Sequence, residues 1–518
     1  ARGCYASAGA FVPFEAEFED GFDTVEWAAR LPWCNGQVGM WGASYFGMTQ
    51  WQAAVMQPPA LRSIVPSITW GNYLNGIQWR GGARELGLTV SWTQTAVAPA
   101  QLLRQYAGDH ARIGRELPQL VGIIDRLPEV YETLPLDALP DPSGVAHYMF
   151  ASMGRSLTDE AYWARMNLDG RYDQIQTPTL HIGGWYDCFL GETLRQYQAM
   201  RAVAEPGAIG PRLVIGPWTH GRFDAQVGDL NFGLASSGIM LNYRGDLTEW
   251  HLRWYDATLR GKPEALAGQS PVEVFVQGEN RWRGYGAWPP PGAHDEVWYC
   301  HSSGEAATRA GDGRLSREQP GDEPHDAYLA DPRDPVPTRG GNILMSAQYR
   351  SGPLDQGPNE DRPDVLCYTS DALSAAYTVL GPVSVTLFAA SSAPDTDWVA
   401  RLVDVYPDGR AMLVADGIVR GSRRESYPAP GVIRPVPPCP VEPGRVYEYA
   451  IDLWAAGLTF LAGHRLRVEI ASSCFPRWDR NLQTGQDGMT SAETAVARQQ
   501  VFHDAARPSR ITLSVVAD

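Results

Sequence analysis

The sequence predicts an α/β core that carries a helical insertion and is followed by an all-β domain. Short apolar strand candidates alternate with amphipathic stretches over residues 1–72 and 170–262, a pattern typical of a parallel sheet with crossover helices. Residues 83–107 and 117–134 have leucine, isoleucine and valine at helical spacing. Beyond the proline-rich segment 286–294, the chain changes to alternating strands joined by turn residues, which favours a sandwich or jelly roll.

Domain boundaries follow from where these patterns change. We expect residues 1–71 to form the first part of the core, 72–170 a helical cap insertion, 171–285 the second part of the core, and 286–518 a C-terminal jelly-roll β-sandwich. A chain of 518 residues with 44% apolar composition has ample material for more than one hydrophobic core.

The core strands are expected where apolar runs precede turn residues, at 62–68, 178–184 and 211–217. In the insertion, prolines remove backbone donors and clash with the preceding turn, so we expect them to divide the region into short helices. These prolines are Pro118, Pro128, Pro135 and Pro140.

The last part of the chain has strand candidates of alternating polarity, at 297–303, 365–370, 383–391, 398–414, 447–453, 466–472 and 510–516. Within 398–414, the Pro-Asp-Gly triplet at 407–409 supplies residues that suit a tight turn. We therefore predict a hairpin there.

Composition excludes several classes of protein. A formal net charge of -16 argues against nucleic-acid binding, and no uninterrupted apolar run is long enough to predict a membrane span. The seven cysteines are scattered and form no C-x-x-C pair, which suits neither a disulfide scaffold nor a zinc site. Cysteine usage therefore favours a reducing compartment, the cytoplasm. The chain opens "ARGCYASAGAF", without a signal-peptide pattern.

Ser44 is the candidate nucleophile, because it lies between two glycines at the junction of an apolar run and a helix-like run. A catalytic serine needs a sharp turn, an N–H for the oxyanion and a histidine to accept its proton. The glycines are Gly42 and Gly47, so the pattern is G-x-S-x-x-G rather than the usual G-x-S-x-G. Such turns also occur for purely steric reasons.

An acid and a histidine follow Ser44 in the order that an α/β-hydrolase requires. Asp187 lies in the loop expected after the strand candidate 178–184, and His220 lies in the loop expected after 211–217. Ser44, His220 and Asp187 then become nucleophile, general base and orienting carboxylate, and the backbone N–H of Tyr45 becomes an oxyanion donor.

Three other residues compete for these roles. Asp173 and Asp224 are alternative acids, and His181 lies within the strand that precedes Asp187. Because His181 is inside the strand rather than after it, we expect a structural histidine that points into or across the sheet.

The motifs around the candidate triad resemble the cocaine esterase and X-prolyl dipeptidyl peptidase family of serine hydrolases. They are "GMWGASYFGMTQWQAA", "GGWYDCFLGETLRQY" and "RLVIGPWTHGRF". Further segments such as "RLVDVYPDGRAMLVADGIVR" extend the resemblance over nearly the whole chain. The resemblance also explains the unusual glycine spacing around Ser44, because Ser-Tyr-x-Gly is the family's own pattern.

The resemblance implies an α/β-hydrolase core, a helical cap and a C-terminal jelly roll. It implies hydrolysis of small-molecule esters or amides through an acyl-enzyme, without a metal or other cofactor. By the same resemblance, the acyl pocket would be lined by Phe189, Trp79, Trp92, Leu344 and Met345. A homodimer is compatible with these expectations.

Two branches of the family differ just after the catalytic acid. The α-amino acid ester hydrolases carry carboxylates two and three residues after it, which bind the substrate's ammonium group. This chain has Phe189 and Leu190 there, which favours a neutral ester with a hydrophobic acyl group. An X-prolyl dipeptidyl peptidase or a β-lactam or amino-acid-ester acylase is the alternative within the family.

Family members have several strands, and a tyrosine that is the second oxyanion donor, before the nucleophile. This chain has 43 residues before Ser44, so the resemblance predicts an N-terminally truncated sequence with an incomplete core and exposed sheet edges. A truncated, non-catalytic binding protein is the alternative of a different class.

Overall fold

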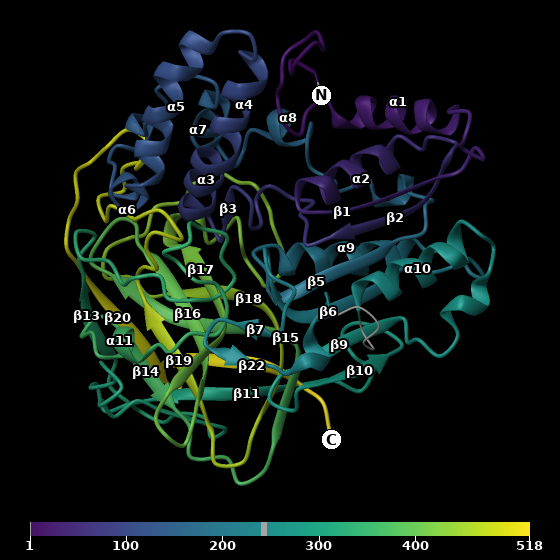
Figure 1. The fold of residues 1–518 in the computed structure, drawn as a ribbon. Coiled ribbons are helices and arrows are strands. Elements are labelled where there is room, and N and C mark those ends of the chain that lie inside the picture. Colours follow the sequence, from purple (N-terminus) through teal and green to yellow (C-terminus); the bar gives the residue numbers. More distant parts are fainter. Residues whose placement is uncertain (1, 240–245, 518) are drawn as a thin grey trace.

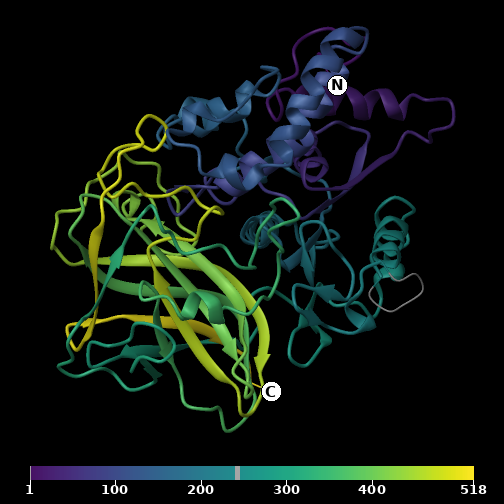
Figure 2. The same ribbon diagram turned by 60° about the vertical axis from the view of Figure 1, so that its left-hand side comes forward.

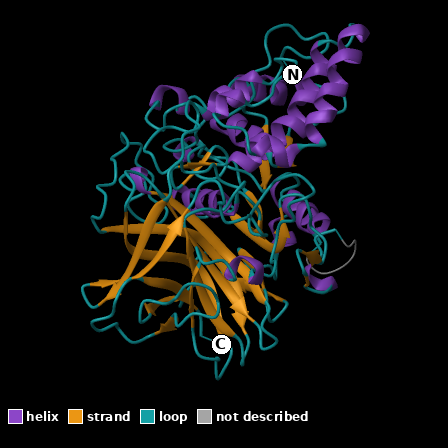
Figure 3. Ribbon diagram, turned by 90° about the vertical axis from the view of Figure 1, so that its left-hand side faces the viewer, coloured by secondary structure: helices purple, strands orange, loops and turns teal. Residues whose placement is uncertain are grey.

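The computed structural model describes residues 2–239 and 246–517, and it divides into a helix-rich part and a strand-rich part (Figure 3). The helix-rich part contains a six-stranded sheet in the order β1-β2-β5-β6-β9-β10. Neighbouring strands from β1 to β9 are parallel, and β10 is antiparallel to β9. Their bounds are β1 Val38–Ala43, β2 Leu61–Ser67, β5 Leu180–Tyr186, β6 Arg212–Thr219, β9 Val272–Val276 and β10 Arg281–Tyr285.

Helices cover both faces of this sheet (Figure 1). On one face, α2 (Tyr45–Val55) and α9 (Leu190–Val203) are joined by a hydrogen bond from Trp51 Nε1 to Gln196 Oε1, and α1 (Glu17–Ala29) packs outside α2. On the other face, α10 (Leu247–Thr258) buries Trp254 against β2, β5 and β6. The arrangement is that of an α/β-hydrolase core, as predicted, and β1 forms one edge of the sheet.

Short elements complete this part. They are β7 Gln226–Val227, β8 Leu230–Asn231, the single turns η4 Leu234–Ser236 and η5 Pro263–Leu266, and the turn η3 Tyr172–Gln174 that leads into β5.

The helical insertion lies between β2 and β5 in the sequence. Its elements are β3 Trp79–Arg80, β4 Ala83–Arg84, α3 Leu86–Trp92, η1 Thr93–Val97, α4 Ala98–Gln105, α5 His110–Ile124, α6 Leu127–Tyr131, η2 Leu136–Ala138, α7 His147–Met153 and α8 Glu160–Trp163. Figure 2 shows these helices (blue) reaching from the core across the end of the β domain.

One proline in the insertion does not act as predicted. Pro118 lies inside α5 instead of ending it. The N–H that proline lacks would have bonded to the carbonyl of Gly114, and Gly114 lies on the exposed face of the helix, where water can satisfy that carbonyl. Pro128 opens α6 and Pro135 precedes η2, so these two prolines do mark boundaries.

The β domain is built on a twelve-stranded sheet that closes over one large apolar core. The path is β13-β20-β15-β22-β11-β12-β14-β19-β16-β17, with β18 on β15 and β21 on β20. The bounds are β11 His294–His301, β12 Arg314–Ser316, β13 Asp326–Ala330, β14 Leu366–Thr369, β15 Tyr377–Ser391, β16 Asp397–Val405, β17 Ala411–Arg420, β18 Tyr447–Phe460, β19 Arg465–Ala471, β20 Ala497–Asp504, β21 Arg507–Pro508 and β22 Arg510–Val515; α11 (Gly357–Glu360) precedes β14.

The hairpin predicted at Pro-Asp-Gly joins β16 to β17. The N–H of Tyr406 donates to the carbonyl of Arg410 at 2.8 Å, and Gly409 has a φ of +91°, which a side chain would disfavour. The turn prediction is therefore confirmed.

The insertion and the β domain are packed together through Arg80. Its buried guanidinium lies 3.6 Å from the ring centroid of Trp454 on β18, and its Nη2 donates to the carbonyl of Asp416 on β17. Cation–π contacts of a desolvated guanidinium contribute about 2 kcal/mol.

Among the described helices, none has the length and apolar character needed to cross a membrane.

Candidate active site

Ser44 lies in the sharp turn between β1 and α2. Its backbone has φ 59° and ψ -123°, a strained conformation for a residue other than glycine. A Cβ on Gly42 would come within 2.6 Å of Phe46 Cβ, and one on Gly47 within 2.6 Å of Thr69 Cβ. Gly42 therefore allows the end of β1 to approach α2, and Gly47 allows α2 to approach the segment that follows β2.

Asp187 and His220 meet Ser44 at the carboxyl ends of β5 and β6. His220 Nε2 lies 2.9 Å from Ser44 Oγ, and His220 Nδ1 lies 2.7 Å from Asp187 Oδ1. Asp187 is fully buried, whereas His220 is 9% exposed. The proton on Nδ1 points to the carboxylate, which leaves Nε2 free to accept the serine proton.

The three rival residues lie elsewhere. Asp173 is exposed in η3, and Asp224 is paired with Arg222 at 2.9 Å. His181 is fully buried in β5, where its Nε2 contacts Thr179 Oγ1 at 3.0 Å and its Nδ1 has no partner among the described residues. Burial lowers the pKa of His181 to about 3, so this histidine stays neutral, and only one of its two ring nitrogens is hydrogen-bonded.

Asp187 is held by a residue that sequence reasoning missed. Asn342, in the segment between β13 and β14, donates from Nδ2 to the carbonyls of Trp185 at 2.7 Å and Asp187 at 3.0 Å. Asn342 is itself 4% exposed. Nothing in the local sequence marks it, because it is 155 residues away from Asp187 and in a segment without regular secondary structure.

Cys188 is a second neighbour that the sequence did not indicate. Its Sγ lies 3.5 Å from His220 Nδ1, and one donor atom each of Asp187, Cys188 and His220 falls within 4.8 Å of the others. Such a cluster could contact a metal ion. Burial and the Asp187 carboxylate, however, raise the pKa of the Cys188 thiol well above its usual range, so it is protonated and a poor metal ligand.

Tyr45 begins helix α2, so its N–H has no acceptor within the helix and points from the positive end of the helix dipole. The phenol side chain of Tyr45 is held by two other residues. Its hydroxyl donates to the Glu17 carboxylate and accepts from the Phe14 N–H at 3.3 Å. Only the backbone of Tyr45 is therefore placed to act beside Ser44.

Most residues predicted to line an acyl pocket share one apolar cluster. The Phe189 ring lies edge-on to the His220 ring, with centroids 5.1 Å apart. Phe189 and Trp79 are buried there, with Trp92, Leu344 and Tyr45 packed against them. Met345 packs in a neighbouring cluster, against Gly87.

Comparison with known proteins assigns the family. Residues 1–222 match the model for X-Pro dipeptidyl-peptidase (S15 family), and residues 265–512 match its C-terminal non-catalytic domain. The chain is 37% identical to cocaine esterase of Rhodococcus sp. (strain MB1 Bresler), over 99% of this chain and 87% of that protein. The chain belongs to the X-Pro dipeptidyl-peptidase (S15) family. As a member of the S15 family it is a serine hydrolase, as the sequence predicts.

Solved structures agree on the fold of this S15-family chain. An aminopeptidase from the marine sediment archaeon Thaumarchaeota archaeon aligns with a TM-score of 0.81 and 24% identity, over 100% of this chain and 84% of that one. An α-amino acid ester hydrolase aligns with a TM-score of 0.75 and 24% identity, over 99% and 84%. At this identity the likeness supports the fold alone: an α/β-hydrolase core with a C-terminal β domain.

Proposed function

We propose that this chain is an esterase that cleaves carboxylic esters with hydrophobic acyl groups, using Ser44, His220 and Asp187. The observation that carries the proposal is the position of the His220 ring, which contacts Ser44 Oγ with one nitrogen and Asp187 Oδ1 with the other. This is the geometry of a nucleophile, a base and an orienting carboxylate.

In the first step, Ser44 Oγ attacks the ester carbonyl carbon while its proton passes to His220 Nε2. The tetrahedral intermediate collapses when the C–O bond to the alcohol breaks and His220 returns the proton to the leaving oxygen. Water then attacks the acyl-enzyme by the same route, releasing the acid and restoring Ser44. Asp187 stays ionised throughout and stabilises the imidazolium through Nδ1.

The oxyanion is assigned to the N-terminus of α2. The Tyr45 N–H follows the nucleophile directly, and the helix dipole favours negative charge at this position. Loss of one oxyanion donor typically lowers the rate by about 10² to 10³.

The surroundings of Asp187 support a neutral substrate. Phe189 and Leu190 are both buried and apolar, so a substrate ammonium would find no carboxylate there. Glu192, the next acid along the chain, has its carboxylate bound to the N–H groups of Gly71 and Asn72 and to Asn75 Nδ2. The Glu192 carboxylate is therefore already hydrogen-bonded within the protein and is not free to bind a substrate ammonium. The related cocaine esterase is, by its name, an esterase as well.

A fluorophosphonate probe tests the nucleophile. We expect labelling of the unmodified chain and none of Ser44→Ala, while Ser67→Ala, at the end of neighbouring strand β2, is labelled like the parent. Full labelling of Ser44→Ala would refute the assignment. No labelling of any form would favour the non-catalytic binding protein.

Substrate class is tested by competition between a phenyl ester of benzoic acid and phenylalanine p-nitroanilide. We expect the neutral ester to be turned over faster, because the wall beside Asp187 is apolar. Faster turnover of the aminoacyl amide would favour the peptidase or acylase alternative.

We further propose a reducing compartment, the cytoplasm. All seven cysteines are free, and five of them are buried as thiols. Reaction of the protein with a thiol reagent after unfolding without reductant should modify seven cysteines; fewer would indicate disulfides.

A further inference from the structure

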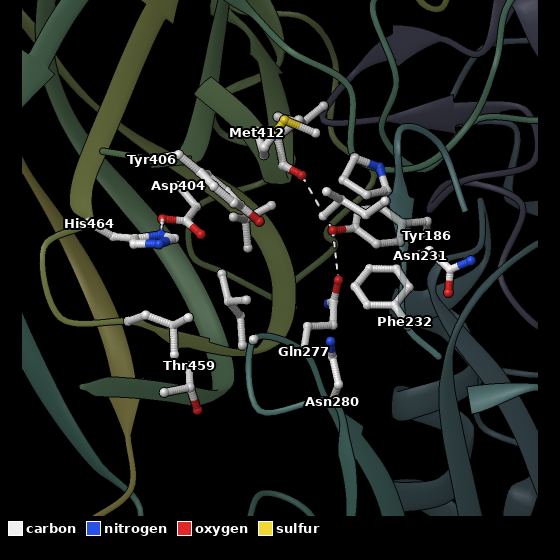
Figure 4. Close-up of a pocket in the computed structure, with 17 residues that line it drawn as sticks. Tyr186, Asn231, Phe232, Gln277, Asn280, Asp404, Tyr406, Met412, Thr459 and His464 are labelled. Carbon is white, nitrogen blue, oxygen red and sulfur yellow. Dashed lines mark hydrogen bonds and ion pairs between the residues drawn. The ribbon is translucent and has the colours of Figure 1, made fainter. Parts of the chain in front are cut away.

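A cavity of about 200 Å³ lies where the core meets the β domain (Figure 4). Tyr186 at the end of β5 and Gln277 after β9 line it from the core, and Asp404, Met412 and His464 line it from the β domain. None of the residues assigned to the reaction above lines this cavity.

One wall is a buried carboxylate–imidazole pair. His464 Nδ1 lies 2.8 Å from Asp404 Oδ1, and the Tyr406 ring covers the imidazole with centroids 4.4 Å apart. Asp404 is 4% and His464 7% exposed. The other carboxylate oxygen, Oδ2, has no hydrogen-bond partner among the described residues, and in Figure 4 it points away from His464 toward the open space.

The opposite wall offers little to bind an anion. The Tyr186 hydroxyl is already donated to Gln277 Oε1 at 2.9 Å, with Leu413 O at 3.4 Å. Most of the remaining lining is apolar, including Phe232 and Leu458, and no lysine or arginine is among the described residues that line the cavity. Asp404 is 4% exposed, and a carboxylate oxygen that faces a largely apolar cavity without a donor of its own is costly unless a ligand supplies one.

We propose that this cavity binds a small organic ammonium ion whose N–H donates to Asp404 Oδ2 and whose apolar group lies against Phe232, Met412 and Leu458. The volume lies below the roughly 300 to 1,000 Å³ of drug-sized pockets, so a single-ring amine fits and a larger one does not. This site is independent of the proposed esterase reaction.

Calorimetry of the full chain with benzylammonium chloride tests the site, with benzyl alcohol and benzoate as uncharged and anionic counterparts. The measurement is made at pH 8, because burial raises the pKa of Asp404 to about 6 and the carboxylate is ionised above that value. We expect binding of the ammonium ion in preference to both counterparts. No binding of benzylammonium at millimolar concentration, or equal binding of benzoate, would overturn the proposal.

Two variants locate the binding. Asp404→Asn keeps the shape and can still accept from His464, but lacks the charge, so we expect affinity to fall about tenfold or more. Asp408→Asn, at the exposed tip of the β16–β17 hairpin, is the matched control and should bind like the parent. Equal binding by Asp404→Asn and the parent would refute the site.

Leu461→Arg provides a test that does not depend on the buried carboxylate. Leu461 lines the cavity but is 41% exposed, so the substitution is tolerated by the fold while it introduces a competing cation. We expect it to weaken benzylammonium binding; unchanged affinity would place the ligand elsewhere.

Discussion

Asn342 is expected to position Asp187, and its removal gives the sharpest test of how the fold supports the site. In Asn342→Leu, a side chain of similar size can no longer donate to the carbonyls of Trp185 and Asp187, which lie 2.7 and 3.0 Å away from Nδ2. The Asp187 carbonyl keeps the Leu190 N–H at 3.1 Å, so the main cost falls on the Trp185 carbonyl. A buried carbonyl left without its partner costs about 1 to 3 kcal/mol, against a typical stability of about 5 to 15 kcal/mol.

That free energy is lost in one of two measurable ways. If the loop stays in place, the free energy of unfolding in urea falls by this amount. If the loop relaxes, Asp187 shifts from His220, and kcat falls while KM for the ester changes little. A shifted carboxylate also changes the acidic limb of the pH–rate profile, where the general base His220 gains its proton, and a general loss of stability would not do this.

Asn359→Leu is the control for this experiment. Asn359 is equally buried, precedes β14 on the same connecting segment, and donates from Nδ2 to the carbonyl of Pro337 at 3.0 Å. It should lower stability and leave kcat and the pH profile unchanged. Asn342→Leu with parental stability and parental kcat would refute the reasoning.

Three further predictions follow from the same geometry. Asp187→Asn should lower kcat by about 10³ to 10⁴, because the amide favours the wrong tautomer of the His220 imidazole. A fall in kcat of less than tenfold in a kinetic assay would exclude Asp187 as the orienting residue. Gly47→Ala should destabilise the chain in thermal unfolding, since the new Cβ would meet Thr69 Cβ at 2.6 Å and Thr69 Cγ2 at 2.8 Å. Thr69→Ser in the same chain removes Cγ2 and should restore part of the loss. An unchanged melting temperature for Gly47→Ala would contradict this prediction. Burial lowers the pKa of His181 from 6.5 to about 3, so the contribution of the neutral ring to the free energy of unfolding is complete above pH 6.5 and is lost as the pH falls toward 3. Between pH 7 and 5, the free energy of unfolding of His181→Gln should therefore fall by about 2 kcal/mol less than that of the parent. Equal falls in urea titrations would show that His181 is not buried as a neutral ring.

The order of the candidate triad could be predicted because each member directly follows a strand of a parallel sheet. Carboxyl ends of such strands meet at one edge, so Ser44, Asp187 and His220 converge whatever the connections between them do. Burial of His181 could be predicted for the same reason, since it lies within the strand instead of at its end. Local pattern and sheet topology were sufficient for these residues.

Other contacts depend on long-range packing that a local pattern does not contain. Asn342 reaches Asp187 from an irregular segment of the β domain, and strands β13 and β20, which pair with each other, were not recognised in the sequence. Pro118 is predicted to end a helix, but the Gly114 carbonyl that loses its donor is on the exposed face, so water can replace that hydrogen bond. The domain boundaries and the homodimer stay predictions.

The burial of Arg80 has a consequence for recombination between relatives. This guanidinium belongs to the insertion, yet its neighbours Trp454 and Asp416 belong to the β domain, so the two segments share one packed interior. A chimera that exchanges only the β domain would leave a buried cation facing foreign side chains. Crossover points that keep Arg80 with strands β17 and β18 should therefore give more folded progeny than points that separate them.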